Sequence, residues 1–284
     1  MSGPAESPVR RWRRRTPAGG GEPRLTVAAV PLSRRTVVAL ALASAVGVLA
    51  FGWPLLVDAA AALGADAPLV LALVLAGVLA VLFVGLGAGD LDVKAVAVLG
   101  LLTAVGAVLR PLAAGTAGVE TVFFLLVLAA RVFGPGFGFV LGATTLFTSA
   151  LLTGGVGPWL PFQMLGAAWV GLGAGLLPRR PRGAAELALL AGYAVVAALA
   201  FGLAMNLSFW PVQLGLGTQL SFVAGDPAAA NLHRFLLFSL ATSLAWDLGR
   251  AVTTALGVLL LGRPVLATLR RAAARAAFAP GGRS

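Results

Sequence analysis

Few side chains in this sequence could carry out chemistry. The chain has ten carboxylates, no cysteine and a single histidine, His233. Thiolate metal sites are therefore excluded, and a metal or histidine-dependent centre would have to be built almost wholly from carboxylates. We expect no hydrolytic chemistry, no catalytic residue, no metal site and no catalytic cofactor.

Polar side chains inside apolar runs are the strongest functional candidates, because placing them in lipid is costly. Asp247 and Arg250 are three residues apart near the middle of the last apolar run, so they share a helix face and can neutralise each other. We expect them to form an intramembrane ion pair. This pair would either stabilise helix packing or line a substrate path.

Gln163 follows Pro161 at the end of another apolar run. Its amide could offer a donor and an acceptor to a ligand one turn below the outer surface, or it could bond to a neighbouring helix. Trp53, Trp159 and Trp210 are predicted at the outer interface, where tryptophan often serves only as an anchor.

The stretch 206–233 is uncharged except for Asp226 and rich in polar side chains. It could close over a pocket for an aromatic or heterocyclic metabolite, or it could be a plain connector. Candidate ligand-binding residues come from the loop after Arg110, the outer end of the sixth predicted span, this stretch and the last helix. They are Arg110, Thr116, Glu120, Trp159, Gln163, Asn206, Trp210, Gln213, His233 and Trp246.

The elements that must position these residues are membrane helices. Apolar residues make up 59% of the chain and charged residues only 11%, against about 25% charged in a soluble domain. Backbone groups in lipid must be satisfied by a helix or a closed barrel. The apolar runs are continuous rather than alternating, so the fold class is an all-α integral membrane bundle.

A span needs about 20 mostly apolar residues, and eight spans are predicted, of which the third and fourth are shorter than this. The uncharged stretch 132–178 is too long for one crossing, and the Gly and Pro residues of 153–158 divide it. The spans are Thr36 to Val57, Ala67 to Gly89, Ala95 to Leu109, Glu120 to Val132, Phe137 to Leu152, Leu160 to Leu177, Ala184 to Asn206 and Arg234 to Leu261.

The basic residues predict the orientation, because cytoplasmic loops are enriched in them. With both termini in the cytoplasm, 18 of the 21 lysines and arginines lie on the cytoplasmic side. The net charge of +11 is thus explained without nucleic acid, and the cluster at 11–15 is interpreted as a tail attracted to anionic lipid. A twin-arginine export signal at 33–35 is the alternative for the first span, disfavoured by the seven spans that follow.

The third span carries small residues three or four apart, which form one face: Ala97, Gly100, Ala104 and Ala107. Such a face allows another helix to approach closely. The helix that packs there could belong to this chain or to a partner.

Two linked motifs lie on either side of the fifth span. Residues 133–142 read FGPGFGFVLG and residues 157–164 read GPWLPFQM, followed by a glycine-rich stretch at 171–178. On these residues, and on 242–269, the chain from Lys94 onward resembles the substrate-binding S component of an energy-coupling factor (ECF) transporter. The resemblance covers about 175 residues.

The resemblance implies six core helices, spans three to eight, and an outward-facing pocket that captures a vitamin or cofactor precursor. It also implies a membrane coupling protein and two cytoplasmic ATPases as partners, since the S component itself hydrolyses nothing. The family's Ala-x-x-x-Ala coupling pattern is relaxed here to Gly100 and Ala104, so the small face of span three is the expected coupling interface. A cobalamin-like ligand is the first guess, with riboflavin and other vitamins as alternatives.

The domain organisation that follows has four parts. Residues 1–35 form a disordered basic cytoplasmic tail, 36–89 two additional transmembrane helices, 92–264 the six-helix S-component-like domain, and 265–284 a basic cytoplasmic tail. The whole is expected in the plasma membrane.

Two other functions are weaker. A standalone ion-coupled secondary transporter would need titratable groups in the bundle beyond the paired Asp247. An intramembrane enzyme lacks a Ser-His or Asp-Asp constellation. The chain also has no phosphate-binding loop of the Gly-x-x-x-x-Gly-Lys type, so ATP would have to be used by partners.

Overall fold

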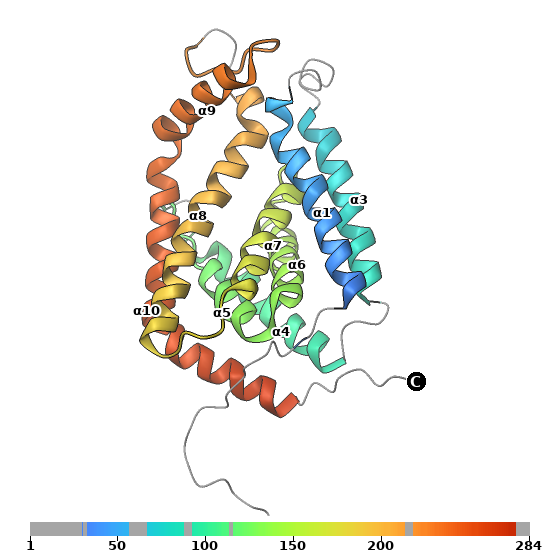
Figure 1. The fold of residues 1–284 in the computed structure, drawn as a ribbon, viewed down its shortest axis with the longest axis vertical. Coiled ribbons are helices and arrows are strands. Elements are labelled where there is room, and N and C mark those ends of the chain that lie inside the picture. The colour runs from blue at the N-terminus through green and yellow to red at the C-terminus, as the bar shows by residue number, and fades with distance from the viewer. Residues whose placement is uncertain are drawn as a thin grey trace, which may run out of the picture.

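The protein is a bundle of helices (Figure 1). The computed structural model describes residues 30, 33–56, 67–87, 93–113, 116–213 and 218–276, and every regular element among them is helical. Helices α5, α6 and α7 occupy the centre, with α8 and α10 on one flank and α1 and α3 on the other. The elements are α1 (Arg34–Gly52), η1 (Trp53–Leu55), α3 (Ala67–Gly87), α4 (Val93–Leu109), η3 (Arg110–Ala113), α5 (Phe123–Phe133), α6 (Pro135–Thr153), α7 (Leu160–Leu176), α8 (Ala184–Gln213), α9 (Ala228–Thr242) and α10 (Leu244–Ala276).

The helices have the lengths and compositions of membrane spans. Five of those described are long and apolar enough to cross a bilayer, namely those within 34–55, 93–112, 135–153, 184–212 and 244–275. Helices α5 and α7 are equally apolar but shorter. The predicted all-α membrane class is thereby supported, whereas the count of eight spans and the cytoplasmic placement of both termini stay predictions. The N-terminal tail to residue 29, the hinge at 88–92 and residues from 277 onward lie outside the described residues.

Most predicted spans correspond to helices within three residues at each end, and the break at 153–158 is confirmed. Helix α6 ends at Thr153, Gly154 adopts the left-handed conformation with φ 66°, and α7 begins at Leu160. The first helix is shorter than predicted, because Trp53 and Pro54 form the 3-10 turn η1. The seventh is longer and ends at Gln213. The polar residues beyond Asn206 continue the helix, and the hydroxyl of Ser208 donates to the carbonyl of Ala204 one turn earlier.

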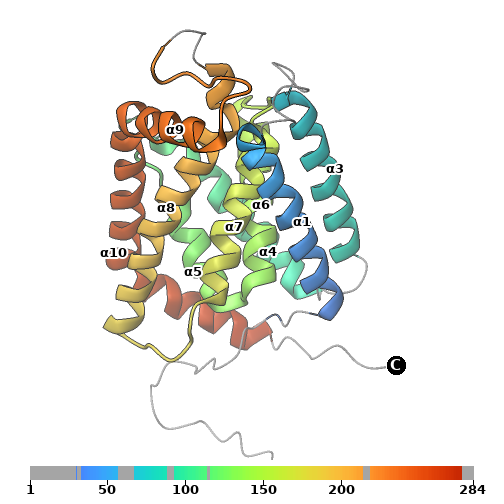
Figure 2. The same ribbon diagram turned by 45° about the horizontal axis from the view of Figure 1, so that its top comes forward.

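The eighth predicted span, 234–261, is wrong as a single helix. Helix α9 ends at Thr242 and α10 begins at Leu244, and Figure 2 shows α9 lying across the end of the bundle while α10 runs along it. The hydroxyl of Thr242 bonds to the carbonyl of Phe238 at 2.8 Å, a side-chain bond that competes with regular helix geometry. Asp247 and Arg250 therefore sit in the first two turns of α10, not at the middle of a long span.

The central pair of helices, α6 and α7, meet backbone to backbone. A Cβ atom on Gly138 or Gly171 would overlap the carbonyl group of the other residue, and one on Gly142 would overlap the carbonyl of Ala167. At the end of the contact, Gly175 lies against the backbone of Pro135. Gly138 and Gly142 belong to the motif at 133–142, and Gly171 and Gly175 belong to the glycine-rich stretch 171–178. The spacing of four residues in each pair permits close helix contact in membranes.

The two N-terminal helices pack on the outside of this centre, α1 against α7 and α8, and α3 against α1 and α7. The indole of Trp169 donates to Oγ of Ser44 at 3.0 Å, and the ring of Phe51 lies edge-on to Phe162 with centroids 5.2 Å apart. Trp53 was predicted as an interfacial anchor, but it is buried and its indole donates to the carbonyl of Ser208 at 2.9 Å. Helix α1 is thus an integral support of α7 and α8.

The end of the bundle opposite α9 is closed by the last part of α10. Pro264 lies inside this helix, and beyond it the chain crosses beneath the bundle (Figure 1). Glu186 on α8 pairs with Arg131 of α5 and with Arg270 of α10, both at 2.7 Å. This cluster joins three helices at that end.

We expect Gly171→Ala to weaken the bundle, because its methyl group would collide with the backbone of α6. Overpacking of this kind costs about 1–3 kcal/mol, which thermal unfolding of the detergent-purified protein measures as a lower Tm. Gly192→Ala on α8 is the matched control, since open space surrounds that position. A Tm equal to that of the control would contradict the backbone contact.

Candidate ligand-binding site

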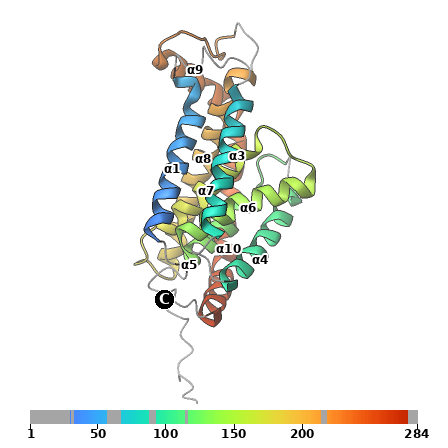
Figure 3. The same cartoon turned by 90° about the vertical axis from the view of Figure 1, so that its right-hand side faces the viewer.

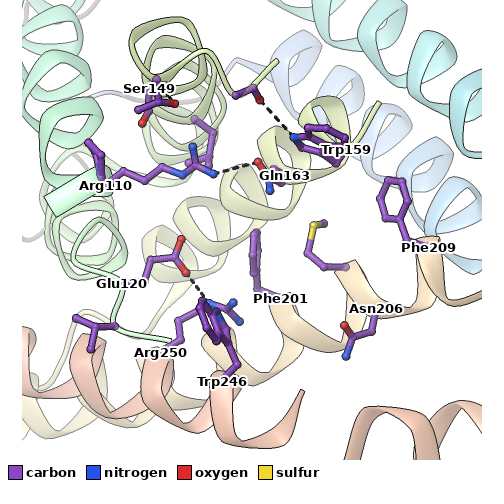
Figure 4. A pocket seen from close by; sticks show the side chains of 16 residues that line it. Arg110, Glu120, Ser149, Trp159, Gln163, Phe201, Asn206, Phe209, Trp246 and Arg250 are labelled. Atoms are coloured by element: carbon purple, nitrogen blue, oxygen red, sulfur yellow. Dashed lines mark hydrogen bonds and ion pairs between the residues drawn. The ribbon is translucent and has the colours of Figure 1, made fainter. Parts of the chain in front are cut away.

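A cavity of about 650 Å³ opens between α6, α7, α8, α10 and the segments that follow α4 (Figure 4). Its volume falls in the range of sites for small organic molecules. The residues around it are Arg110, Pro111, Val119, Glu120, Leu146, Ser149, Thr153, Gly155, Trp159, Gln163, Phe201, Met205, Asn206, Phe209, Trp246 and Arg250.

Six of the ten residues predicted for ligand binding line this cavity: Arg110, Glu120, Trp159, Gln163, Asn206 and Trp246. The others lie elsewhere. Thr116 is exposed on the loop before α5, and His233 is exposed on α9. Trp210 is fully buried in a separate cluster with Phe235, and the side chain of Gln213 lies outside the described part of the structure.

Residues 218–227 form a cap at the start of α9. Asn231 accepts from the backbone N–H of Val223 at 3.1 Å and donates to its carbonyl at 2.8 Å. The indole of Trp210 donates to the carbonyl of Leu220, and Arg234 pairs with Asp226 at 2.6 Å. Among the described side chains of that predicted set, Asn206 of α8 is the one that lines the cavity.

Arg110 and Gln163 form the first polar group of the cavity. Arg110 stands where α4 passes into the 3-10 turn η3, and its side chain extends toward α7 (Figure 4). Its Nη2 donates to Oε1 of Gln163 at 3.1 Å. Gln163 thus makes the interhelical bond that its sequence position allowed and faces the cavity as well.

A cluster of three charges forms the second polar group. Arg250 donates from Nε to Oε2 of Glu120 at 2.5 Å and from Nη1 to Oδ1 of Asp247 at 2.7 Å. Its guanidinium also lies 5.1 Å from the ring centroid of Phe201. The predicted ion pair of Asp247 with Arg250 is therefore present. Glu120, from the loop before α5, is a second partner of Arg250 that the prediction did not include.

Aromatic and thioether side chains make the apolar walls. Phe201, Met205 and Phe209 are four residues apart on α8, and Trp159 and Trp246 close the cavity from α7 and α10 (Figure 4). The three α8 residues were missed from the sequence. Their spacing on one helix face with Asn206 was a usable signal, but nothing in it distinguishes a cavity wall from ordinary packing.

The small-residue face of α4 divides between the inside and the outside of the bundle. Ala107 is fully buried, whereas Ala97, Gly100 and Ala104 are exposed, with no atom within 4 Å of a Cβ placed on Gly100. Figure 3 shows α4 at the edge of the molecule, beside α6. Packing among the described residues therefore does not account for these three positions.

Metal binding finds no support in the part of the chain that the structure describes. No group of three or more His, Asp or Glu side chains there is arranged to hold an ion. The polar side chains that line the cavity are two arginines, two amides, two hydroxyls and one carboxylate.

Comparison with known families agrees with the architecture. A family model described as "ECF transporter, substrate-specific component" matches residues 94–262, which is more than half of the chain. Among curated proteins and solved structures, nothing matches the chain. The chain belongs to this family of transporter subunits, and α1 and α3 precede the matched region.

We expect Arg250→Met to destabilise the protein strongly, because it leaves the Glu120 and Asp247 carboxylates without their shared cation. Loss of one member of a buried pair costs about 3–5 kcal/mol, whereas loss of an exposed pair costs about 1 kcal/mol or less. Thermal unfolding in detergent should therefore show a large drop in Tm.

Arg234→Met is the control, since Arg234 and Asp226 form a partly exposed pair outside the cavity. Equal decreases in Tm for the two substitutions would mean that the ion pairs of Arg250 with Glu120 and Asp247 do not stabilise the bundle more than an exposed pair does.

Proposed function

We propose that this ECF transporter substrate-specific component captures a vitamin or cofactor precursor in the cavity between α6, α7, α8 and α10, and that partner ATPases drive its release. The observation that carries the proposal is the cavity itself. It combines aromatic walls with a few polar groups from four helices and two loops, the usual composition of a small-molecule site.

The size of the cavity bears on the ligand. A volume of about 650 Å³ accommodates a single heterocyclic vitamin. A corrinoid is considerably larger, so the cavity favours a ligand of riboflavin size over the cobalamin-like molecule expected first. The aromatic side chains on three helices suit a flat ring system.

Release requires partners in this proposal. The carboxylates that line or border the cavity, Glu120 and Asp247, are both bound by Arg250. A transporter that works alone by proton or sodium coupling needs a carboxylate free to bind and release the ion. We therefore favour energy supplied by a membrane coupling protein and two ATPases, with both termini of this chain in the cytoplasm.

The exposed part of the α4 face is the proposed contact with the coupling protein. Ala97, Gly100 and Ala104 leave room for the backbone of another helix to approach. The family resemblance implies a coupling contact through this helix, and the exposure of the three residues supports it.

We expect the detergent-purified protein to retain its ligand. Mass spectrometry of the small molecules extracted from it should recover one compound in about equimolar amount, because a tightly bound ligand dissociates slowly. A matched sample of Phe201→Ala, which removes a cavity wall, should retain much less. Recovery of no compound from folded wild-type protein would contradict capture, and uptake by the chain alone in proteoliposomes would favour the ion-coupled alternative.

We expect Gly100→Leu to prevent assembly with the coupling protein and ATPases, because the added side chain would hold the partner helix away. Co-purification of the co-expressed complex measures this, and retention of ligand by the separate subunit should not change. Gly192→Leu on α8 is the control, since Gly192 is also exposed with open space around it. If both variants assembled as well as wild type, the proposed contact through α4 would be contradicted.

A further inference from the structure

The charges in and beside the cavity fall into two groups. In the first group, Arg250 is shared by Glu120 and Asp247. In the second, Arg110 has a neutral partner, the Oε1 atom of Gln163. Within the described residues, no carboxylate forms an ion pair with Arg110 at 4 Å or less. The cavity wall therefore carries one arginine that has no direct ion pair among the described residues, and the charge of Glu120 acts on it from a longer distance.

Arg110 has donors to spare. A guanidinium carries five N–H groups and keeps its charge at any physiological pH, and one of the five is used in the bond to Gln163. Since Gln163 accepts that bond through Oε1, its NH2 group is left to donate, and no partner for it is found among the described residues. Both side chains line the cavity, so these donors are available to a ligand.

Ser149 adds a third donor on the same cavity. Its side chain is fully buried, and its Oγ has no hydrogen-bond partner among the described residues. Ser149 lies on the α6 face that also brings Leu146 and Thr153 to the cavity. A buried hydroxyl without a partner is unfavourable, so a ligand acceptor at this position would be stabilising.

The walls near these donors are aromatic. Trp159 and Trp246 are 46% and 43% exposed, and Phe201 and Phe209 face the same space (Figure 4). Exposed indole faces in a cavity favour stacking with a flat ring.

We propose that the ligand is a small aromatic or heterocyclic acid whose carboxylate binds Arg110, with the amide of Gln163 and the hydroxyl of Ser149 as additional donors. The inference rests on the proposed function, because it names the ligand class of the same cavity. A carboxylate offers the unused N–H groups of Arg110 a bidentate, charge-assisted partner that matches the planar guanidinium, and an uncharged ligand does not. The ring then lies between the aromatic walls.

The test compares matched acids and amides on the full-length protein in detergent. The probes are benzoate, nicotinate and indole-3-acetate, each beside its uncharged carboxamide, with tryptophan fluorescence and thermal shift as readouts. Wild type should bind at least one acid ten or more times as tightly as the corresponding amide. Arg110→Gln should lose this preference, Arg110→Lys should keep part of it, and Arg234→Gln, outside the cavity, should keep all of it.

Several results would overturn the inference while leaving the proposed function in place. These are equal binding of acids and amides by wild type, an acid preference that survives in Arg110→Gln, and tighter binding of phenyl phosphate than of benzoate. If no probe binds, the inference is tested on the molecule that mass spectrometry recovers from the purified protein. An acid that Arg110→Gln no longer retains supports the inference, and any other retained molecule overturns it. Retention of nothing by wild type contradicts the proposed function itself.

Discussion

The close contact of α6 and α7 is the constraint on which the rest of the molecule depends. Lipid tails are as apolar as the helix surfaces, so association in a membrane relies on close packing rather than on removal of apolar area from water. Gly138, Gly142 and Gly171 allow the two backbones to touch. Helix α4 packs on α6 and helix α5 packs on α7. At the ends of α6 and α7 that lie toward α9, Ser149 and Gln163 line one cavity.

Charge in this apolar environment is tolerated where it is paired. Arg250 forms ion pairs with both Glu120 and Asp247 and joins α10 to the loop before α5, and Glu186 joins three helices at the opposite end. Arg110 differs, because its hydrogen-bond partner is the neutral amide of Gln163. The ion pairs of Arg250 and Glu186 join helices, whereas most N–H groups of Arg110 are left to bind a ligand. This difference is the physical basis of the acid-binding inference.

The helices α1 and α3 precede the region matched to the family, yet they are not loosely attached. Phe51 of α1 contacts Phe162, which in turn packs edge-on against Phe209 of the cavity wall, with centroids 5.2 Å apart in both pairs. Trp53 bonds to the backbone of α8 one residue before that phenylalanine. The two added helices thus pack on the side of α7 and α8 that faces away from the cavity and support that wall.

The sequence by itself determined the all-helical membrane class, most helix boundaries and six residues of the cavity, because hydrophobic run length, Gly-Pro breaks and isolated polar residues are local signals. Tertiary structure decided the rest. No local signal separates α9 from α10 at Ser243, and none brings Glu120 to Arg250 across 130 residues. Likewise, the spacing of Phe201 and Phe209 is that of any buried helix face. The sequence does not distinguish Trp210 from Trp159, but packing buries Trp210 and leaves Trp159 at the cavity.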